Sequence, residues 1–522
     1  LVSGLRLVLP QLDAWRPQLL EKISALTGTP VDASQIAASW QTFGPTLDVR
    51  DIHVGLKDGG TMAVKRVTLA LDVWQSLLHM RWQFRDLTFW QLQVHTNTPI
   101  QTNDGGESLK TDRISDLFLR QFDHFTLRDS HLSFLTISGQ RAELAVPQLT
   151  WLNGRNRHRA EGQLSLSSLT GQHGVMQVRM DLRDEDGLLN KGRVWLQADD
   201  IDVKPWLGRW MQDNIALKSA RFSLEGWMTI EKGDVASGDV WLKKGGASWQ
   251  GDSEVHHLSV DNLTAHLSHD KQSWGFYIPD TRIAIDDKPW PSGALAMAWI
   301  PGQDVGGDGH QRSDELRIRA SNLALSGLSG LQPFADKLAP SLGELWRTTQ
   351  PSGKINLLAL DIPLQATEKT RFQAQWSDLA WKQWKLLPGA EHFSGSLNGS
   401  VEHGELRARM TKAQMPYAGV FRAPLEIAAG EATLSWVKND KGFMLDGRDI
   451  DVQATGVRAR GGFRYLQPQG DDPWLGILAG ISTNDGGQAW RYFPENLMGK
   501  ALVDYLSGAI KAGQARDATL VY

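Results

Sequence analysis

The sequence predicts a mainly β protein: a long, curled antiparallel sheet with only a few short helices. Three observations lead to this fold class. Apolar and polar residues alternate along many short segments, separated by turns rich in Gly and Asp, which is the pattern of antiparallel strands. A short phrase around Asp or Asn recurs along the chain and shifts that alternation by one residue. Helical spacing appears in few places, so helices cannot cover most of the sheet.

The recurring phrase places two apolar residues three positions apart, with Asp or Asn directly before the second. Residues at i and i+3 share one face of a strand only if a residue between them is extra, so each copy predicts a β-bulge. From the third copy on, the spacing is 62, 60, 56 and 71 residues, which indicates a repeated unit of roughly 60 residues. We expect the outer curve of the sheet at Asp51, Asp86, Asp200, Asn262, Asn322, Asp378 and Asp449.

The first part of the chain predicts a helix and then strands. Leu and Ile recur at helical spacing over residues 15–26, and Gly28 and Pro30 follow as stop signals. Alternation then predicts successive strands over residues 44–96. A polar loop, which we expect to be mobile, spans residues 96–112.

The remainder of the chain continues the same pattern. Strands resume over residues 122–203, and alternation persists over residues 221–466. Short helices are expected at residues 205–211, 333–346 and 494–506, and a last strand begins after the third of them.

Composition excludes several classes of protein and site. The net charge of -4 and the isoelectric point near 6.4 provide no basic field for nucleic acid. The absence of cysteine rules out disulfides and thiolate metal sites. No apolar run is long enough to span a bilayer. Residues 1–9 are the end of a membrane helix or a mobile terminus, and we expect the chain to be a fragment of a longer protein.

The sequence contains no recognisable catalytic motif. It lacks a Gly-x-Ser-x-Gly nucleophile elbow and a Gly-rich loop ending in Gly-Lys-Ser or Gly-Lys-Thr. The densest histidine cluster is His256, His257, His266 and His269. His256 and His257 are adjacent on a predicted strand and point to opposite faces, so spacing alone assembles no metal site. We expect no catalytic residue, no metal and no cofactor, and therefore no enzyme.

The predicted sheet has one apolar face that must be hidden from water. The sheet can curl and fill its interior with its own side chains, or it can curl into an open groove whose apolar lining meets an apolar ligand. The chain has 22 Trp residues, and such bulky side chains at alternate positions suit a plain core. The residues alone therefore favour a self-filled interior over a lined groove.

Two stretches resemble a known family. Residues 26–31 (Leu-Thr-Gly-Thr-Pro-Val), Trp40, residues 44–47 (Gly-Pro-Thr-Leu) and residues 49–52 (Val-Arg-Asp-Ile) resemble the amino-terminal module of AsmA-like envelope proteins of Gram-negative bacteria. The tail is similar to a recurring element of a long member of that family, in residues 492–497, 505–506 and 513–515. The resemblance runs through the whole chain.

The resemblance implies a repeating β-groove, which reverses the preference for a filled interior. It implies bridge-like transport of phospholipids between the inner and outer membrane along the apolar groove, without catalysis. The implied partners are phospholipids, the inner membrane through an amino-terminal helix missing from this chain, and outer-membrane or envelope proteins at a missing carboxyl end. The implied location is the periplasm, anchored to the inner membrane.

The resemblance also organises the chain and its surface. It implies a membrane-proximal segment and helix (1–30), an amino-terminal AsmA-like module (31–152), repeated β-groove units of roughly 60 residues (153–492), and a helix with the start of the next unit (493–522). Acyl chains are then expected to contact the inner face of the strands. Its expected groove-lining residues are Val54, Leu69, Phe89, Val203, Leu267, Phe276, Met297, Leu325, Trp376, Trp381, Leu434 and Val452.

Two other functions compete with lipid transport. A non-catalytic envelope scaffold or assembly protein would keep its β interior filled and dry. A polysaccharide-acting β-solenoid enzyme would need an acidic cleft, and the drifting period without a short regular coil repeat disfavours it.

Overall fold

The computed structural model describes residues 9–522 with several gaps. Outside the described residues lie 1–8, 42–43, 57–58, 81–82, 100–116, 136–140, 168–173, 205–215, 252, 271–272, 303–313, 334–335, 337–339 and 386. Within the described residues the strands form one 27-stranded sheet that does not close into a barrel. The predicted mainly β fold with few short helices is thus confirmed. The chain divides into two compact units.

Unit 1 comprises residues 1–250 and 257–270. Its strands alternate between buried and exposed side chains, as the sequence pattern predicts. Its elements are η1 (Leu9–Trp15), α2 (Arg16–Thr27), β1 (Val31–Asp32), β2 (Gln35–Gln41), β3 (Gly44–Gly55), β4 (Thr61–Leu71), α3 (Val73–His79), β5 (Phe84–Pro99), η2 (Leu117–Gln121), β6 (His124–Leu135), β7 (Arg141–Asn153), β8 (Arg157–Ser167), β9 (Gly174–Arg183), β10 (Lys191–Asp202), β11 (Leu217–Glu231), β12 (Asp234–Gln250) and most of β13 (Val255–Asp270).

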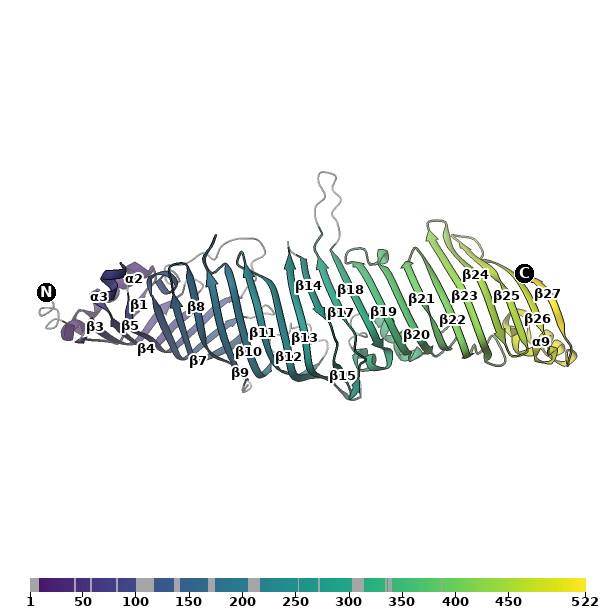
Figure 1. Ribbon diagram of the computed structural model, residues 1–522, viewed down its shortest axis with the longest axis horizontal. Coiled ribbons are helices and arrows are strands. Elements are labelled where there is room, and N and C mark those ends of the chain that lie inside the picture. Colours follow the sequence, from purple (N-terminus) through teal and green to yellow (C-terminus); the bar gives the residue numbers. More distant parts are fainter. Residues whose placement is uncertain are drawn as a thin grey trace. The chain divides into compact units, whose positions relative to one another are not determined.

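Unit 2 comprises residues 251–256 and 271–522. Figure 1 shows its strands β19 to β26 side by side in chain order. Its elements are β14 (Ser273–Ile278), β15 (Ile283–Ile285), β16 (Lys288–Pro289), β17 (Leu295–Ile300), β18 (Glu315–Ala324), η4 (Leu325–Leu331), α7 (Pro340–Thr349), β19 (Ser352–Pro363), η5 (Thr367–Lys369), β20 (Arg371–Trp381), β21 (Ala390–Ser400), β22 (His403–Met415), β23 (Leu425–Asn439), β24 (Gly442–Ala454), β25 (Val457–Pro468), β26 (Trp474–Thr483), η6 (Gly486–Tyr492), α8 (Glu495–Met498), α9 (Lys500–Ala509) and β27 (Ala515–Val521).

Strand pairing is antiparallel along most of the sheet, with one correction to the prediction. Strands β5 and β6 run parallel, with Phe89 opposite Leu127. Parallel neighbours need a crossover connection, whereas antiparallel neighbours need only a hairpin. The described part of that connection contains the π-helical turn η2, which packs on the sheet. The sheet is therefore mixed.

Two of the predicted helices are confirmed. The helix expected at residues 15–26 is η1 and α2, and the helix expected at 494–506 is split into α8 and α9 at Gly499, whose φ is 79°. Within the range 333–346 the described residues include the start of α7. The helix expected at 205–211 lies outside the described residues.

Two predictions about the chain around β4 and β5 need revision. Alternation predicted only strands there, but α3 connects β4 to β5, and the Asp72 side chain caps it by accepting from Gln75 N at 3.0 Å. The polar loop expected at residues 96–112 begins inside β5, which ends at Pro99, and from residue 100 it lies outside the described residues.

The recurring phrase marks backbone kinks, as predicted. Six of its Asp and Asn residues have a positive φ between 51° and 60°: Asp51, Asp200, Asn262, Asn322, Asp378 and Asp449. This left-handed region is one that Asn and Asp enter more easily than other side chains.

The register shows the extra residue directly in several copies of the phrase. Between Trp376 and Leu379, strand β20 advances three residues while β21 advances two. Strand β24 does the same between Gly447 and Ile450. Apolar residues on both sides of the bulge therefore stay on one face.

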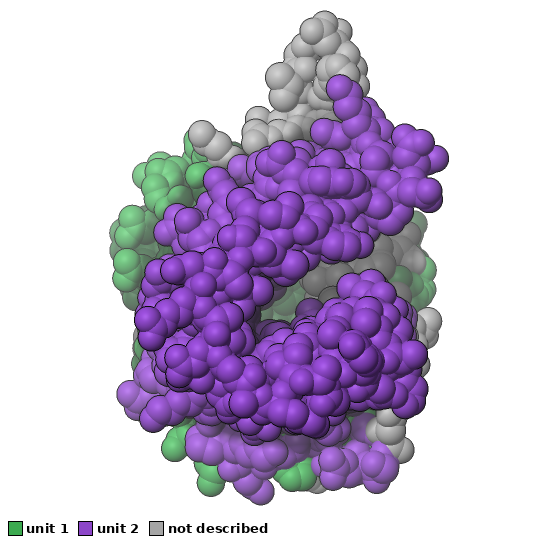
Figure 2. All heavy atoms as spheres, turned by 90° about the vertical axis from the view of Figure 1, so that its right-hand side faces the viewer, with its two compact units in different colours: residues 1–250, 257–270 green, residues 251–256, 271–522 purple. Residues whose placement is uncertain are grey.

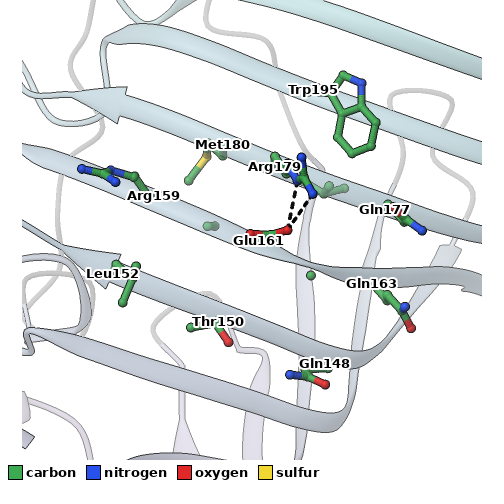
Figure 3. Close-up of a pocket in the computed structure, with 13 residues that line it drawn as sticks. Gln148, Thr150, Leu152, Arg159, Glu161, Gln163, Gln177, Arg179, Met180 and Trp195 are labelled. Atoms are coloured by element: carbon green, nitrogen blue, oxygen red, sulfur yellow. Dashed lines mark hydrogen bonds and ion pairs between the residues drawn. The ribbon is translucent and has the colours of Figure 1, made fainter.

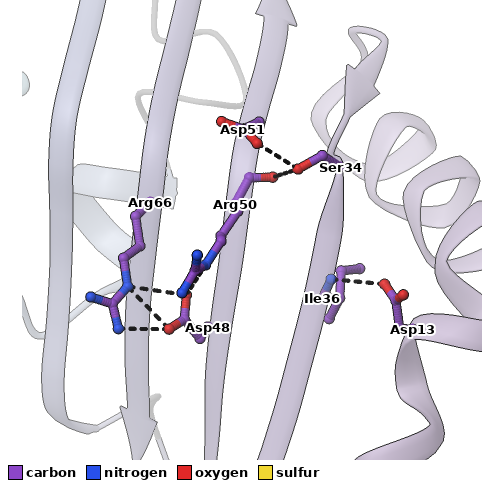
Figure 4. Close-up of polar contacts among 7 residues, drawn as sticks. All are labelled: Asp13, Ser34, Ile36, Asp48, Arg50, Asp51 and Arg66. Carbon is purple, nitrogen blue, oxygen red and sulfur yellow. Dashed lines mark hydrogen bonds and ion pairs between the residues drawn. The ribbon is translucent and has the colours of Figure 1, made fainter.

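The first copy of the phrase shows how its acidic residue is held. Asp51 accepts from Ser34 Oγ at 2.6 Å, and nearby Asp48 accepts from Arg66 Nη2 at 2.6 Å (Figure 4). These contacts lie on exposed positions of β3 and β4 and on the segment before β2. Polar side chains thus fasten the kink from the solvent side.

The phrase predicted one bulge at the wrong residue, and some left-handed residues lie outside it. Asp86 lacks a positive φ, and the extra residue of β5 is its neighbour Arg85, because Ala70 faces Asp86 while Leu71 faces Phe84. Left-handed Gln91 and Asp129 were not predicted.

Candidate functional site: the apolar face of the sheet

One face of unit 2 carries a continuous row of apolar side chains and glycines. Register pairing joins neighbouring strands at positions that point to the same side. We call this side the apolar face and the opposite side the charged face. The row runs Phe276, Met297, Ile318, Leu360, Phe372, Gly399, Gly404, Trp436, Leu445, Tyr465 and Leu475.

Two further rows lie on the same face, on either side of the bulges. None of their residues carries a charge, so an apolar surface continues from strand to strand. The first runs Ile278, Leu295, Ala320, Leu358, Ala374, Leu397, Leu406, Leu434, Gly447, Phe463 and Ile477. The second runs Leu379, Phe393, Met410, Gly430, Val452, Ala459 and Ile481.

The charged face of unit 2 is fastened by ion pairs between neighbouring strands. Arg464 Nε donates to Asp446 Oδ1 at 2.6 Å, and this hydrogen bond holds the pKa of Asp446 below its usual value. Arg458 does the same for the pKa of Asp451. Opposite charges on facing strands stabilise the strand pairing, although water screens them and keeps the effect small. Their position also leaves the apolar face without charge.

Much of the apolar face in unit 2 is incompletely covered. Phe276 is 38% exposed and Met297 is 36% exposed, although both belong to the apolar row. The atoms of unit 2 curve around a central hollow (Figure 2). An apolar surface that stays open to solvent is costly and typically marks a binding site.

Paired glycines let aromatic rings lie flat on the apolar face. A Cβ atom on Gly404 would overlap the ring of Trp436, and one on Gly447 would overlap the ring of Phe463. The rings of Phe372 and Trp436 stack over the glycines with centroids 6.3 Å apart. These rings spread over the sheet, and glycine supplies the space because it has no side chain.

Unit 1 has the same kind of row on its own apolar face. It runs Val49, Val67, Phe89, Leu127, Leu149, Gly162, Val178, Leu196, Gly226 and Val240. Here, however, one region is filled. The buried cluster consists of Val64, Val67, Phe84, Leu87, Phe89, Leu92, Phe125, Leu127 and Val146.

The π-helical turn η2 covers that cluster with two aromatic side chains. Phe118 lies 5.1 Å from the rings of Phe89 and Phe125, and 5.4 Å from Phe122. Asn153 Nδ2 donates to the carbonyl oxygens of Phe118 and Phe122 at 2.7 and 2.9 Å. The turn is thus tied to the end of β7, and it closes this part of the apolar face.

The sequence-predicted residues fall into groups with different surroundings. Phe89 is buried in the filled cluster, and Leu69 packs against it. Val54 is buried on β3, opposite Met62. Val203 packs against a smaller cluster of Met176, Ala198 and Ile201. In unit 1 the predicted residues therefore touch mainly protein.

In unit 2 two of the predicted residues, Phe276 and Met297, are exposed, and Trp376 is buried. Phe276 and Met297 are register partners in the apolar row. Trp376 and Trp381 come together on the ring of Phe393, at centroid distances of 5.6 and 5.1 Å. The buried indole nitrogen of Trp376 makes no hydrogen bond to another described residue.

The remaining predicted residues separate by element. Leu434 and Val452 lie in the apolar rows of β23 and β24. Leu267 is partly buried on β13, beside Gly238. Leu325 is not on a strand; it is the buried first residue of η4. The sequence analysis did not name Phe393, Trp436 or Phe463, because only cross-strand register shows that they join the same surface.

A polar hollow lies on the charged face of unit 1, between β7 and β10. It measures about 690 Å³ and is lined by Gln163, Gln177 and Trp195 among others. Figure 3 shows Arg179 and Glu161 paired across neighbouring strands inside it. A carboxylate already paired with arginine on an open surface is a poor general acid or base, so the hollow offers no evident catalytic group.

The histidine cluster does not assemble a metal site. His256 Nδ1 lies 2.8 Å from Asp286, and His266 Nδ1 lies 2.5 Å from Asp239. These are separate pairs. Across the described part of the chain, no group of three or more His, Asp or Glu residues is placed to hold a metal ion. No helix within the described ranges has the length and apolar character needed to cross a membrane.

Comparison with known proteins gives one consistent result. The model of the family described as "YhdP protein" matches residues 1–522. The intermembrane phospholipid transporter YhdP of Escherichia coli (strain K12) is 74% identical over 522 residues, which is all of this chain and 41% of that relative. No solved structure matches the chain. The resemblance found in the sequence is confirmed, and the chain belongs to the YhdP family.

Proposed function

We propose that phospholipids move between the inner and outer membrane along the apolar face of this sheet, without catalysis. The observation that carries the proposal is the uncharged surface of unit 2, which continues from strand to strand and is left partly exposed. The name of the Escherichia coli relative, an intermembrane phospholipid transporter, supports it. The chain spans only 41% of that relative, so transport by the longer protein is part of the proposal.

The energetics of such a path are simple. An acyl chain that leaves a bilayer for an apolar trough stays out of water, and each Å² kept from water is worth about 25 cal/mol. The polar headgroup remains in solvent at the open side. No bond is made or broken, so the path needs no nucleophile, acid, base, metal or cofactor.

We propose acyl-chain contact for the predicted groove lining. In unit 2 the partly exposed members are directly available, whereas Phe89 in unit 1 is covered by Phe118. The full set is Val54, Leu69, Phe89, Val203, Leu267, Phe276, Met297, Leu325, Trp376, Trp381, Leu434 and Val452.

Location and partners follow from the same proposal. The protein works in the periplasm, anchored to the inner membrane, and meets the outer membrane or envelope proteins at its far end. The four sequence regions, 1–30, 31–152, 153–492 and 493–522, remain a proposed division of the chain. These points are supported by the family resemblance and by the name of the Escherichia coli relative.

Site-specific photocrosslinking in cells tests the lipid path. The photoreactive amino acid replaces Val452 or Leu434 on the apolar face, and its matched control replaces the chain neighbours Asp451 or Ser435 on the charged face. Phospholipid should be captured at Val452 and Leu434 and not at the controls. Equal labelling on both faces, or none, contradicts the proposal.

A second candidate is a non-catalytic envelope scaffold, favoured by the filled cluster of unit 1. There Phe118 and Phe122 already occupy the space over the apolar face. Mass spectrometry of gently extracted protein separates the two functions. A scaffold carries no stoichiometric lipid, whereas a lipid path retains phospholipid at the mass of one or more molecules.

A further inference from the structure

Helix α3 presents unusually exposed apolar side chains at one end of strands β4 and β5. Trp74, Leu77, Leu78 and Met80 are between 63% and 91% exposed, and no residue of the helix is buried. The expected arrangement for a short surface helix is the opposite, with its apolar residues packed on the sheet. A cluster of this kind typically marks a surface that meets another apolar phase.

Hydrogen bonds of the Asp72 and Ser76 side chains hold the helix in place, and none of its residues is buried. Asp72 caps its start by accepting from Gln75 N at 3.0 Å. Ser76 Oγ donates to Asp72 O at 2.6 Å and accepts from Gln83 N at 2.9 Å, which ties the helix to the beginning of β5. At the other end, the N–H of Met80 donates to Ser76 O. The large apolar side chains are thus free to contact something outside the chain.

Two arginine side chains lie beside α3. A hollow of about 930 Å³ lies beside the helix and is lined by Leu77, Met80, Arg120 and Arg155. Two acidic residues next to the helix are engaged internally. Asp72 caps α3, and Asp123 accepts from Phe84 N at 3.1 Å and pairs with His124 at 3.0 Å.

We propose that α3 docks on the surface of a bilayer that contains anionic phospholipid. Trp and Leu side chains enter the boundary between headgroups and acyl chains, where an amphipathic ring is most stable. Arg120 and Arg155 meet the negative headgroups, each adding attraction that salt weakens. Docking brings the strand ends of unit 1 to the membrane surface, and it does not depend on lipid transport or on a membrane-spanning helix.

Because the chain has no cysteine, a single introduced thiol can report on this contact. The full chain is made as Leu78→Cys or Met80→Cys and labelled with an environment-sensitive fluorophore. The matched control is Val175→Cys, a half-exposed residue at the start of β9, at the end of that strand away from Arg155. The probes are vesicles of phosphatidylethanolamine with phosphatidylglycerol, and vesicles of phosphatidylcholine.

With anionic vesicles, the labels at 78 and 80 should shift to the blue and be quenched by brominated acyl chains, and the label at 175 should not. In flotation assays on the unlabelled chain, Trp74→Ser and the double variant Arg120→Gln/Arg155→Gln should each lower binding about fivefold or more. Raised salt should weaken binding of the parent chain.

Other outcomes overturn the proposal. Equal binding to phosphatidylcholine vesicles contradicts the role of charge, and unchanged fluorescence with both vesicles contradicts docking. A blue shift that rises with protein concentration without vesicles identifies a second copy of the chain as the occupant. Circular dichroism of each variant shows that the sheet is intact, and Val175→Ser, a change at an exposed apolar residue at the far end of β9, should leave binding like that of the parent.

Discussion

The two units use the same strand pattern but leave their apolar faces in different states. In unit 1, the region over β4 to β7 is closed by Phe118 and Phe122, and Leu87 beneath them is 2% exposed. In unit 2, Phe276 and Met297 of the apolar row remain 38% and 36% exposed. Alternation and bulges alone thus build an apolar face, and a separate segment decides whether that face is open or filled.

The physical cause of the difference lies in connections and in glycines. In unit 1 the parallel pair β5 and β6 requires a crossover, and its described end, η2, turns aromatic residues onto the sheet. In unit 2 the neighbours from β17 to β26 pair in antiparallel fashion. Aromatic rings there lie over glycines such as Gly404 and Gly447, so they add apolar surface without filling space.

The largest expected loss of unfolding free energy is that of a leucine in unit 1, and a leucine in unit 2 provides the comparison. Leu87→Ala should cost about 2–5 kcal/mol of unfolding free energy, because it leaves a cavity in a packed cluster. Leu434→Ala on the open face should cost about 1 kcal/mol, because part of that side chain is already in contact with solvent. Denaturant unfolding, monitored in each unit by hydrogen exchange, measures the loss of unfolding free energy for both variants. Equal costs would mean that unit 2 is packed as tightly as unit 1.

Loss of the Asn153 hydrogen bonds that hold η2 should give the next largest loss of stability. Asn153→Ala removes the donors to the carbonyls of Phe118 and Phe122, at a cost of about 1–3 kcal/mol. It also removes the acceptor of the Trp151 and His158 side chains. Amide exchange in η2 should rise more than exchange in β9, and if both rise equally the turn is not an independent cover.

The bulges should respond alike in both units. Asp378 has a φ of 52°, and Asp378→Val should cost about 1–2 kcal/mol because a β-branched residue is disfavoured in the left-handed region. Asp378→Gly is the matched control and should be nearly neutral. Asp200→Val in unit 1, also at 52°, should behave like Asp378→Val. Thermal unfolding of the variants provides the measurement, and a neutral valine would contradict the strained geometry.

The smallest expected effect is a pH dependence in unit 1. The hydrogen bond to Asp123 raises the pKa of His124 above its ordinary value, about 6.5. The stability from this pair is therefore fully present below that ordinary value and is lost as the pH rises through the folded pKa. Titration by nuclear magnetic resonance should give His124 a higher midpoint in the parent chain than in the Asp123→Asn variant. A higher midpoint in the variant would contradict the pairing.

Much of the fold could be predicted from particular residues. The phrase around Asp378 and Asp449 identified bulges because a slip in alternation is local in sequence, and the structure adds that both residues are left-handed. Helix α3 was missed because Val73 continues the apolar alternation of Leu69 and Leu71, and because the helix has only 7 residues. The extra residue at Arg85 was placed one position late for the same reason: local patterns locate an element better than its boundary.

The sequence by itself determined the mainly β fold, the apolar and charged faces, six of the kinks and the family. Each of these depends on neighbours within a few residues or on a resemblance that covers the whole chain. Only the tertiary structure decided that Phe393 joins Trp376 and Trp381, that Phe118 covers Phe89, and that the α3 side chains stay exposed. These facts depend on register and on chain crossings, which bring distant residues together and leave no periodic trace in the sequence.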